Sequence, residues 1–298
     1  MNMNLRDLQY LSAIAEYEHM GRAATACHIS QPTMSMQIKK LEEELGVQLL
    51  ERANKRVRLS AHGKIIAARA TEIFHQSNAL KELAKSLRDP LAGECRLGAF
   101  PTLAPYYLPH IVPLITSALP KTQLLLIEDK TDRLLDNLKS GTLDMALIAL
   151  PIEEKNLSSH ALFTEPFYLA VSHSHRLAGC KFVTAKEVMN ERMLLLEDGH
   201  CMRDQALDVC RIVGAHELSN FRATSLETLR QMVVANVGIT LIPKCAIMQN
   251  ASIRMLPFKG NPYRRTIGLV WRNSYPKMAM VEALKNILSK HSLDALSF

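Results

Sequence analysis

The spacing of apolar residues changes once along the chain, between residues 88 and 93, and this change limits the possible folds. Before it, apolar residues recur every three or four positions, as at Leu5, Leu8 and Leu11, which is typical of helices. After it, strand-like runs alternate with helix-like segments, which is typical of α/β units with parallel sheets. Since 298 residues exceed one small domain, the sequence predicts a helical N-terminal domain and a larger α/β domain.

Residues 21–46 have the layout of a helix-turn-helix, in which the second helix can enter the major groove of DNA. We expect a short helix from about residue 21 to 28 and a longer third helix that Gly46 ends. Ser30 suits the N-cap of the longer helix, and Pro32 suits its first turn. Residues 49–52 and 56–59 are expected to form two short strands of a basic hairpin.

Polar side chains on the third helix are candidates to contact base edges, because amides and hydroxyls match the hydrogen-bonding groups of the major groove. Arginines around it are candidates to hold phosphates, and the net charge of +7 fits a polyanionic partner. The alternative interpretation is a polar helix face that only meets solvent. The candidates are Arg22, Ser30, Gln31, Pro32, Thr33, Ser35, Gln37, Lys39, Arg52, Arg56 and Arg58.

Residues 61–87 predict one long helix with an apolar seam. Ile66, Ile73, Leu80 and Leu87 lie seven positions apart, as in a coiled coil. The seam can pack against the N-terminal domain or against a second copy of the helix. We favour the second interpretation, in which this helix forms a dimer.

Apolar runs and cysteines predict the compartment. No apolar run is long enough to cross a membrane, and the first 20 residues do not resemble a signal peptide. We therefore expect a cytoplasmic protein with no membrane partner, whose six cysteines are free thiols in a reducing compartment. Any pair that oxidised there would be a sensor or a catalyst. His173 and His175 could suggest metal binding, but no cysteine or carboxylate lies nearby at ligand spacing, so we expect a solvated loop there and no cofactor or metal.

Cys201 has the surroundings of a reactive thiol. It follows His200 at a predicted strand-to-helix junction and precedes Arg203. A helix N-terminus and neighbouring positive charge lower a thiol's pKa, and the thiolate is the reactive form. Asp198 and Asp204 oppose this effect, so the sequence leaves the balance open.

Cys210 lies nine residues after Cys201. In a regular helix the two residues would lie about 13 Å apart along the axis, whereas a disulfide needs Cα atoms roughly 4.4–6.8 Å apart. Either the pair never bonds, or bonding unfolds the helix. A further alternative is that Cys210 is only a buried helical thiol.

The first 52 residues resemble the winged-helix signature of the LysR-type transcriptional regulators. The matching motifs are Arg22-Ala23-Ala24, Ser30-Gln31-Pro32-Thr33, Leu41-Glu42-Glu43-Glu44-Leu45-Gly46 and Leu49-Leu50-Glu51-Arg52. The resemblance implies a homotetramer built as a dimer of dimers. It also implies promoter DNA and RNA polymerase as partners, and control through a C-terminal cleft.

The resemblance also implies a domain organisation for the whole chain. Residues 1–60 would form the winged helix-turn-helix and residues 61–88 the linker helix. Residues 89–298 would form a regulatory domain like a periplasmic binding protein, with two α/β subdomains. The first would hold about 92–163 and 269–298, and the second about 164–268.

Residues 194–210, 221–230 and 264–270 resemble the peroxide-sensing members of the same family. The resemblance implies that Cys201 reacts with hydrogen peroxide and that Cys210 resolves it in a reversible disulfide. It places Thr102, Thr131 and His200 around the peroxide and Arg265 near the sulfur, with Asp204 in the same site. An alternative for each threonine is a helix cap at a strand end.

The resemblance implies a regulator that activates antioxidant genes through this disulfide and that a cellular dithiol reductant resets, rather than an enzyme. Two other functions stay open from the residues alone. One is a regulator whose inducer is a small metabolite bound in the same cleft. The other is a thiol peroxidase that uses Cys201, although an enzyme would not need a DNA-reading domain.

Overall fold

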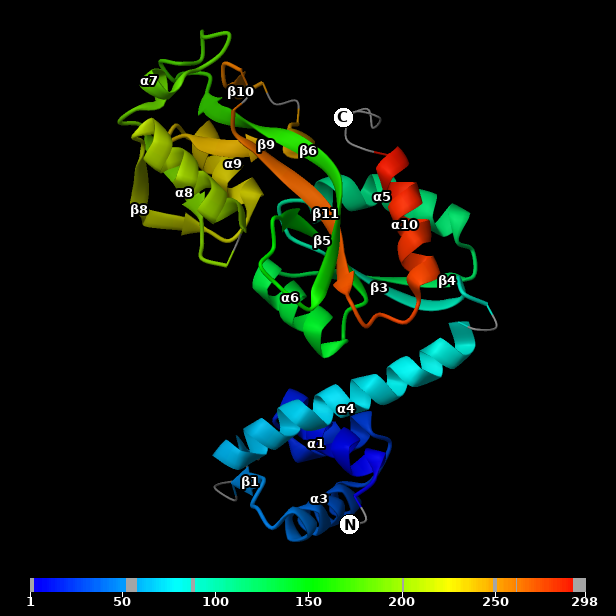
Figure 1. The fold of residues 1–298 in the computed structure, drawn as a ribbon. Coiled ribbons are helices and arrows are strands. Elements are labelled where there is room, and N and C mark those ends of the chain that lie inside the picture. The colour runs from blue at the N-terminus through cyan, green and yellow to red at the C-terminus, as the bar shows by residue number, and fades with distance from the viewer. Residues whose placement is uncertain are drawn as a thin grey trace. The chain divides into compact units, whose positions relative to one another are not determined.

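The computed structural model describes residues 3–51, 58–86, 89–199, 201–248, 251–260 and 262–291 (Figure 1). Within its helices and strands, the side chains of residues 75, 79, 81–86, 201, 204, 208, 213, 219 and 220 lie outside this description. The chain divides into two units, residues 1–84 and 85–298. No helix of the described residues is both long and apolar enough to cross a membrane.

Three helices form the core of the N-terminal unit: α1 (Leu5–Tyr17), α2 (Met20–Ala26) and α3 (Gln31–Leu45). Their apolar faces pack around Leu11 and Ile38, which are fully buried. The predicted limits of α3 are confirmed. The Ser30 side chain accepts a hydrogen bond from the Thr33 backbone N–H, and Gly46 ends the helix with φ of 69°.

The hairpin after α3 begins and ends as two antiparallel strands, β1 (Leu50–Glu51) and β2 (Arg58–Leu59). The predicted hairpin is confirmed at its base, and residues 52–57 lie outside the description. Glu42 of α3 accepts hydrogen bonds from the backbone N–H groups of Leu49 at 2.7 Å and Leu50 at 3.1 Å. This carboxylate attaches the hairpin to α3.

The long helix α4 (Ala61–Ser86) follows Ser60, whose hydroxyl accepts from the Gly63 N–H as expected of a cap. Its first half packs on the N-terminal core, with Ala70 buried and Ile66 half-buried. Further along, Ile73 and Leu80 are 43% and 68% exposed. The start of the apolar seam, at Ile66, therefore packs on the N-terminal core, whereas Ile73 and Leu80 are exposed. Leu87 lies outside the described residues.

The C-terminal unit contains a parallel layer that agrees with the sequence. Strand β3 (Gly93–Ala99) pairs in parallel with β4 (Thr122–Glu128) and with β5 (Met145–Leu150). Helices α5 (Ala104–Ala118) and α6 (Thr131–Ser140) connect these strands. A C-terminal helix, α10 (Met278–Lys290), contacts α5.

Two long strands carry the sheet further and make it mixed, so the expectation of parallel sheets throughout is wrong. Strand β6 (Leu157–Ser172) pairs antiparallel with β11 (Arg264–Arg272) through its first ten residues. Its remaining residues pair antiparallel with β9 (Thr240–Pro243) and β10 (Ile253–Pro257). Its first half was not predicted, because residues 157–166 are mostly half-buried or exposed and form no long apolar run.

A second group of elements lies between α7 (Ala185–Val188) and η1 (Lys244–Ala246). It contains the parallel strands β7 (Arg192–Leu196) and β8 (His216–Ala223), with helix α8 (Cys201–Val213) between them and α9 (Leu226–Val234) after them. The predicted division at 163–164 and 268–269 falls inside β6 and β11. It stays a prediction.

Candidate functional site

Cys201 and Cys210 lie in one continuous helix, α8. The helical rise places their Cα atoms about 13 Å apart along the axis, roughly twice the separation that a disulfide tolerates. Cys210 is a free thiol and is 4% exposed. The geometric conflict expected from the sequence is therefore present: the two sulfurs can join only if α8 unfolds.

Burial keeps Cys210 protonated. Loss of solvent, followed by the negative charge of Glu217, raises the pKa of the Cys210 thiol to about 11. Because the thiolate is the nucleophile in disulfide chemistry, this sulfur is unreactive while α8 is folded.

Cys201 is the first residue of α8, where backbone N–H groups without helical partners favour negative charge. Its side chain and that of Asp204 lie outside the described residues, and so does His200. Their expected roles stay predictions.

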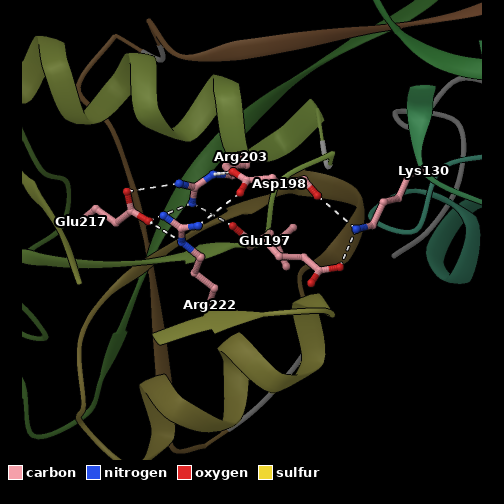
Figure 2. A network of polar contacts seen from close by, with 7 residues as sticks. Lys130, Glu197, Asp198, Arg203, Glu217 and Arg222 are labelled. Carbon is pink, nitrogen blue, oxygen red and sulfur yellow. Dashed lines mark hydrogen bonds and ion pairs between the residues drawn. The ribbon is translucent and has the colours of Figure 1, made fainter. Parts of the chain in front are cut away.

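Six charged side chains form one network around the turn that precedes α8 (Figure 2). Asp198 pairs with Arg203 at 2.8 Å and with Arg222 at 3.2 Å. Arg203 also donates to the Leu196 carbonyl at 2.9 Å and to both oxygens of Glu217. The network consists of Lys130, Arg203, Arg222, Glu197, Asp198 and Glu217.

Three bases and three acids balance one another in this network. We expected Asp198 to oppose a thiolate at Cys201, but its carboxylate is held by two guanidinium groups. Asp198 is thus paired with cations inside this network, and the effect of the surroundings on the Cys201 thiol stays a prediction.

Lys130, the N-cap residue of α6, connects this network to the part of the C-terminal unit that contains β3, β4 and β5. Its ammonium group pairs with Glu197 and donates to the Asp198 carbonyl at 3.0 Å. Gly199 has φ of 86°, and a Cβ there would lie 3.1 Å from the Lys130 side chain. Only glycine fits this position without strain. Sequence reasoning missed this contact, because Lys130 and Glu197 are 67 residues apart.

The structure brings Arg265 and Thr102 into direct contact. The guanidinium of Arg265 is completely buried and donates to the Thr102 hydroxyl at 2.9 Å and to its carbonyl at 3.1 Å. Glu165 supplies the opposite charge at 2.7 Å. The rings of Phe100 and Phe167 lie 5.2 and 5.8 Å from the guanidinium carbon. No local pattern indicated the role of Glu165.

Within the described part of the chain, the sulfur of Cys245 lies 3.5 Å from a guanidinium nitrogen of Arg265. Cys245 is buried, and burial raises its pKa to about 12 despite the nearby guanidinium. Cys95 is also buried, whereas Cys27, at the C-cap of α2, is half-buried. A contact of Arg265 with Cys201 stays a prediction.

Neither threonine caps a helix, so that alternative interpretation is wrong. Leu103 and Lys130 hold the N-cap positions of α5 and α6, and neither helix has a side-chain cap hydrogen bond. The Thr131 hydroxyl oxygen is buried and has no hydrogen-bond partner within the described part of the chain. A buried hydroxyl without a hydrogen-bond partner is costly.

The candidate DNA-reading residues of α3 differ in exposure. Gln31, Pro32, Ser35 and Lys39 are exposed, while Thr33 and Gln37 are half-buried. The Ser30 and Thr33 hydroxyls bond to each other at 2.7 Å, so Ser30 also serves the helix.

Among the surrounding arginines, Arg22 and Arg58 are exposed, whereas Arg52 and Arg56 lie outside the described residues. The sequence analysis missed Met36, whose exposed side chain neighbours Ser35 on α3. Apolar side chains can contact the thymine methyl group in the major groove.

Two family models together account for most of the chain. "Bacterial regulatory helix-turn-helix protein, lysR family" matches residues 5–64, and "LysR substrate binding domain" matches residues 88–292. The class is thus a bacterial regulator that joins a DNA-binding head to a sensor module. The chain belongs to the LysR family; it is a DNA-binding transcription regulator and not an enzyme.

Its relatives include a hydrogen peroxide-inducible genes activator from Dickeya chrysanthemi, 43% identical over 293 residues, covering 97% of this chain and 96% of the relative. The DNA-binding transcriptional dual regulator OxyR of Escherichia coli strain K12 is 44% identical over 285 residues, or 95% and 93% of the two chains.

Two solved structures are similar in fold as well as in sequence. A cysteine-to-aspartate variant of full-length OxyR from Pseudomonas aeruginosa has a TM-score of 0.78 and 34% identity, covering 97% of this chain and 95% of that one. The oxidised form of OxyR has a TM-score of 0.63 and 40% identity, covering 68% and 97%.

Proposed function

We propose that this protein senses hydrogen peroxide and activates antioxidant genes through a reversible Cys201–Cys210 disulfide. The observation that carries the proposal is the position of both cysteines in α8, too far apart to bond unless the helix unfolds. Relatives above 40% identity over nearly the whole chain are named hydrogen peroxide-inducible genes activators. Their name fits a thiol sensor better than a metabolite sensor.

The proposed chemistry has two steps. The Cys201 thiolate attacks one oxygen of the peroxide, the O–O bond breaks, and the departing hydroxide takes a proton to become water. Cys201 is then a sulfenic acid, oxidised by two electrons. In the second step the Cys210 thiolate attacks that sulfur, an S–S bond forms and a second hydroxide leaves as water. A cellular dithiol reductant returns both thiols by exchange.

The residues around the cleft have distinct parts in this scheme. Thr131, with its unsatisfied buried hydroxyl, and Thr102 are proposed to bind the peroxide together with His200. Arg265 orients the Thr102 hydroxyl by the 2.9 Å hydrogen bond. Asp204, on the helix that would unfold, is proposed to belong to the same site.

Disulfide formation is proposed to change the DNA-binding state by unfolding α8. The helix and the network around it form one arrangement, and the oxidised segment must adopt another, so the sensor has two discrete states. The change in the regulatory domain would alter how subunits pack, and so the spacing of the DNA-reading helices.

The assembly and partners follow the same proposal. Residues 1–60 read promoter DNA, residues 61–88 dimerise, and residues 89–298 sense the signal. The exposed Ile73 and Leu80 of α4 support a dimer seam, and two dimers would form a homotetramer. The regulator would act on RNA polymerase in the cytoplasm, where a reducing environment keeps the switch off.

Stoichiometric peroxide, followed by alkylation and mass mapping of every cysteine, tests the chemistry. Footprinting on a candidate promoter under the same conditions tests the output. We expect one Cys201–Cys210 disulfide and a changed footprint, and neither in Cys201→Ser. If both sulfurs stay free while promoter occupancy changes, the disulfide mechanism is wrong. If the Cys201→Ser protein responded normally, the inducer would instead be a small metabolite.

A further inference from the structure

We propose that Lys130 is a positioning residue that holds the sensor in its helical, dithiol form. Its contacts with Glu197 and the Asp198 carbonyl, hereafter the Lys130 bridge, fasten the turn before Cys201 to the start of α6. This inference rests on the proposed disulfide switch and adds a residue that controls its equilibrium. Figure 2 shows the bridge at one end of the charged network.

The bridge depends on the exact course of residues 197–199. Lys130 binds one side chain and one backbone carbonyl of this turn, and its methylenes pack over Gly199. The turn keeps its course because Asp198 is held in turn by Arg203 of α8 and Arg222 of β8. Glu197 and Asp198 are thus held by three cations, which come from the start of α6, from α8 and from β8.

Unfolding of α8 removes part of this support. Arg203 is the third residue of α8, and its buried guanidinium contacts the Leu196 carbonyl, Asp198 and Glu217 only while the helix is formed. A disulfide between Cys201 and Cys210 displaces the backbone between them, Arg203 included. Asp198 then loses one of its two guanidinium partners, and the turn that presents its carbonyl to Lys130 is released.

A contact made in only one state shifts the equilibrium towards that state. Lys130 and Glu197 are 34% and 37% exposed, so the bridge is partly screened by solvent. Pairs of this kind contribute about 0.2–1 kcal/mol, which corresponds to roughly a 1.5- to fivefold change in an equilibrium constant. Loss of the bridge should therefore make the sensor easier to oxidise by this factor.

The test is a redox titration of the full-length protein in glutathione buffers. In each buffer, oxidised glutathione accepts two electrons and becomes two thiols while Cys201 and Cys210 become one disulfide. The disulfide fraction is read by acid quench, alkylation and mass mapping. The variants are Lys130→Met, Lys130→Arg and Lys139→Met. Lys139 is the matched control, because it lies on α6 with similar exposure but pairs with Glu154 and Asp136.

We expect Lys130→Met to raise the equilibrium constant for the disulfide by about 1.5- to fivefold. Lys130→Arg, which keeps the charge, and Lys139→Met should match the wild type. Melting of the reduced proteins shows whether a shift merely reflects lost fold stability. A Lys130→Met equilibrium equal to that of the wild type, or a shift that Lys139→Met shares, overturns the inference. A wild-type protein that forms no Cys201–Cys210 disulfide overturns the proposed function itself, and this inference with it.

Discussion

At the scale of single residues, the most constrained group is the Arg265 guanidinium. It has no exposed surface, and its charge is balanced by Glu165, which is also buried. Removing one partner from a buried ion pair leaves the other charge uncompensated in a poorly polar interior. The contact with Thr102 makes this pair both a structural element and a determinant of the candidate peroxide site.

Glu165→Gln tests that role. The variant keeps the shape of the side chain but leaves Arg265 without its counter-charge, so we expect a loss of about 3–5 kcal/mol of unfolding free energy. Urea denaturation of the reduced protein measures it. Glu282→Gln, which removes an exposed partner of Lys285, is the control and should cost no more than about 1 kcal/mol. Equal losses in the two variants would contradict this assignment.

Cys210 gives a prediction about pH and reactivity. Its pKa of about 11 against an ordinary 9.0 lowers the thiolate fraction at neutral pH by about a hundredfold. We expect the reduced, folded protein to alkylate at Cys210 at least that much more slowly than the protein unfolded in urea. Peptide mapping after timed iodoacetamide treatment measures both rates. Rapid labelling of Cys210 in the folded state would show that its thiol is not buried.

The same shift has a consequence for stability. Below about pH 9 the thiol is protonated in the folded and unfolded states, so Cys210 adds no pH dependence. Between pH 9 and 11 only the unfolded state loses the proton, and unfolding becomes easier as pH rises. Urea titrations at pH 8 and pH 10.5 should therefore show lower stability at the higher pH. In Cys210→Ala this part of the decrease should disappear.

At the scale of elements, local chemistry decided which features were predictable. α3 could be placed from Ser30, Pro32 and Gly46, because caps depend on adjacent residues. The strand β8 was missed because its sequence, His-Glu-Leu-Ser-Asn-Phe-Arg-Ala, has no apolar run, and its pairing with β7 is set by the fold.

In the candidate site too, residues with a local sequence signal could be predicted, and residues whose partners lie far along the chain could not. The cysteine pair was visible as a spacing along one helix. Thr102 and Arg265 were implied by resemblance, but their contact joins residues 163 positions apart. Glu165 and Lys130 carried no local signal, since each acquires its partner only in the folded chain.

The attachment of the β1–β2 hairpin to α3 gives a prediction at this scale. Glu42→Ala leaves the backbone N–H groups of Leu49 and Leu50 without their shared carboxylate, at a cost of about 1–3 kcal/mol. Hydrogen exchange of the peptide over residues 47–51 should accelerate. Glu43→Ala is the control, because Glu43 pairs with exposed Lys39 at 3.7 Å and does not contact the hairpin strands in the described part of the chain. Unchanged exchange in Glu42→Ala would show that other contacts hold the hairpin.

At the scale of the whole molecule, the uncovered half of α4 bears on assembly. Ile73 and Leu80 are exposed large apolar residues on a helix whose first half is already packed. A protein that dimerises along this helix hides both side chains.

The Ile73→Lys/Leu80→Lys double variant should therefore dissociate the assembly. Sedimentation at several concentrations measures the mass, and DNA binding should weaken in parallel because two half-sites are no longer read together. Ala68→Lys, at an exposed position on another face of α4, should leave the mass unchanged. A double variant that sediments like the wild type would place the dimer contact elsewhere.

Because Cys210 is buried, the two steps of the proposed sensor would depend on different rates. The first sulfur meets the oxidant by collision, so its rate rises with dose. The sulfur of Cys210 is buried and becomes accessible only when α8 unfolds. The rate of this unfolding does not depend on the concentration of peroxide. Above some concentration of oxidant, the response time would therefore reach a ceiling set by the opening rate of a single helix, and a brief pulse and a heavy one would switch the regulator equally fast.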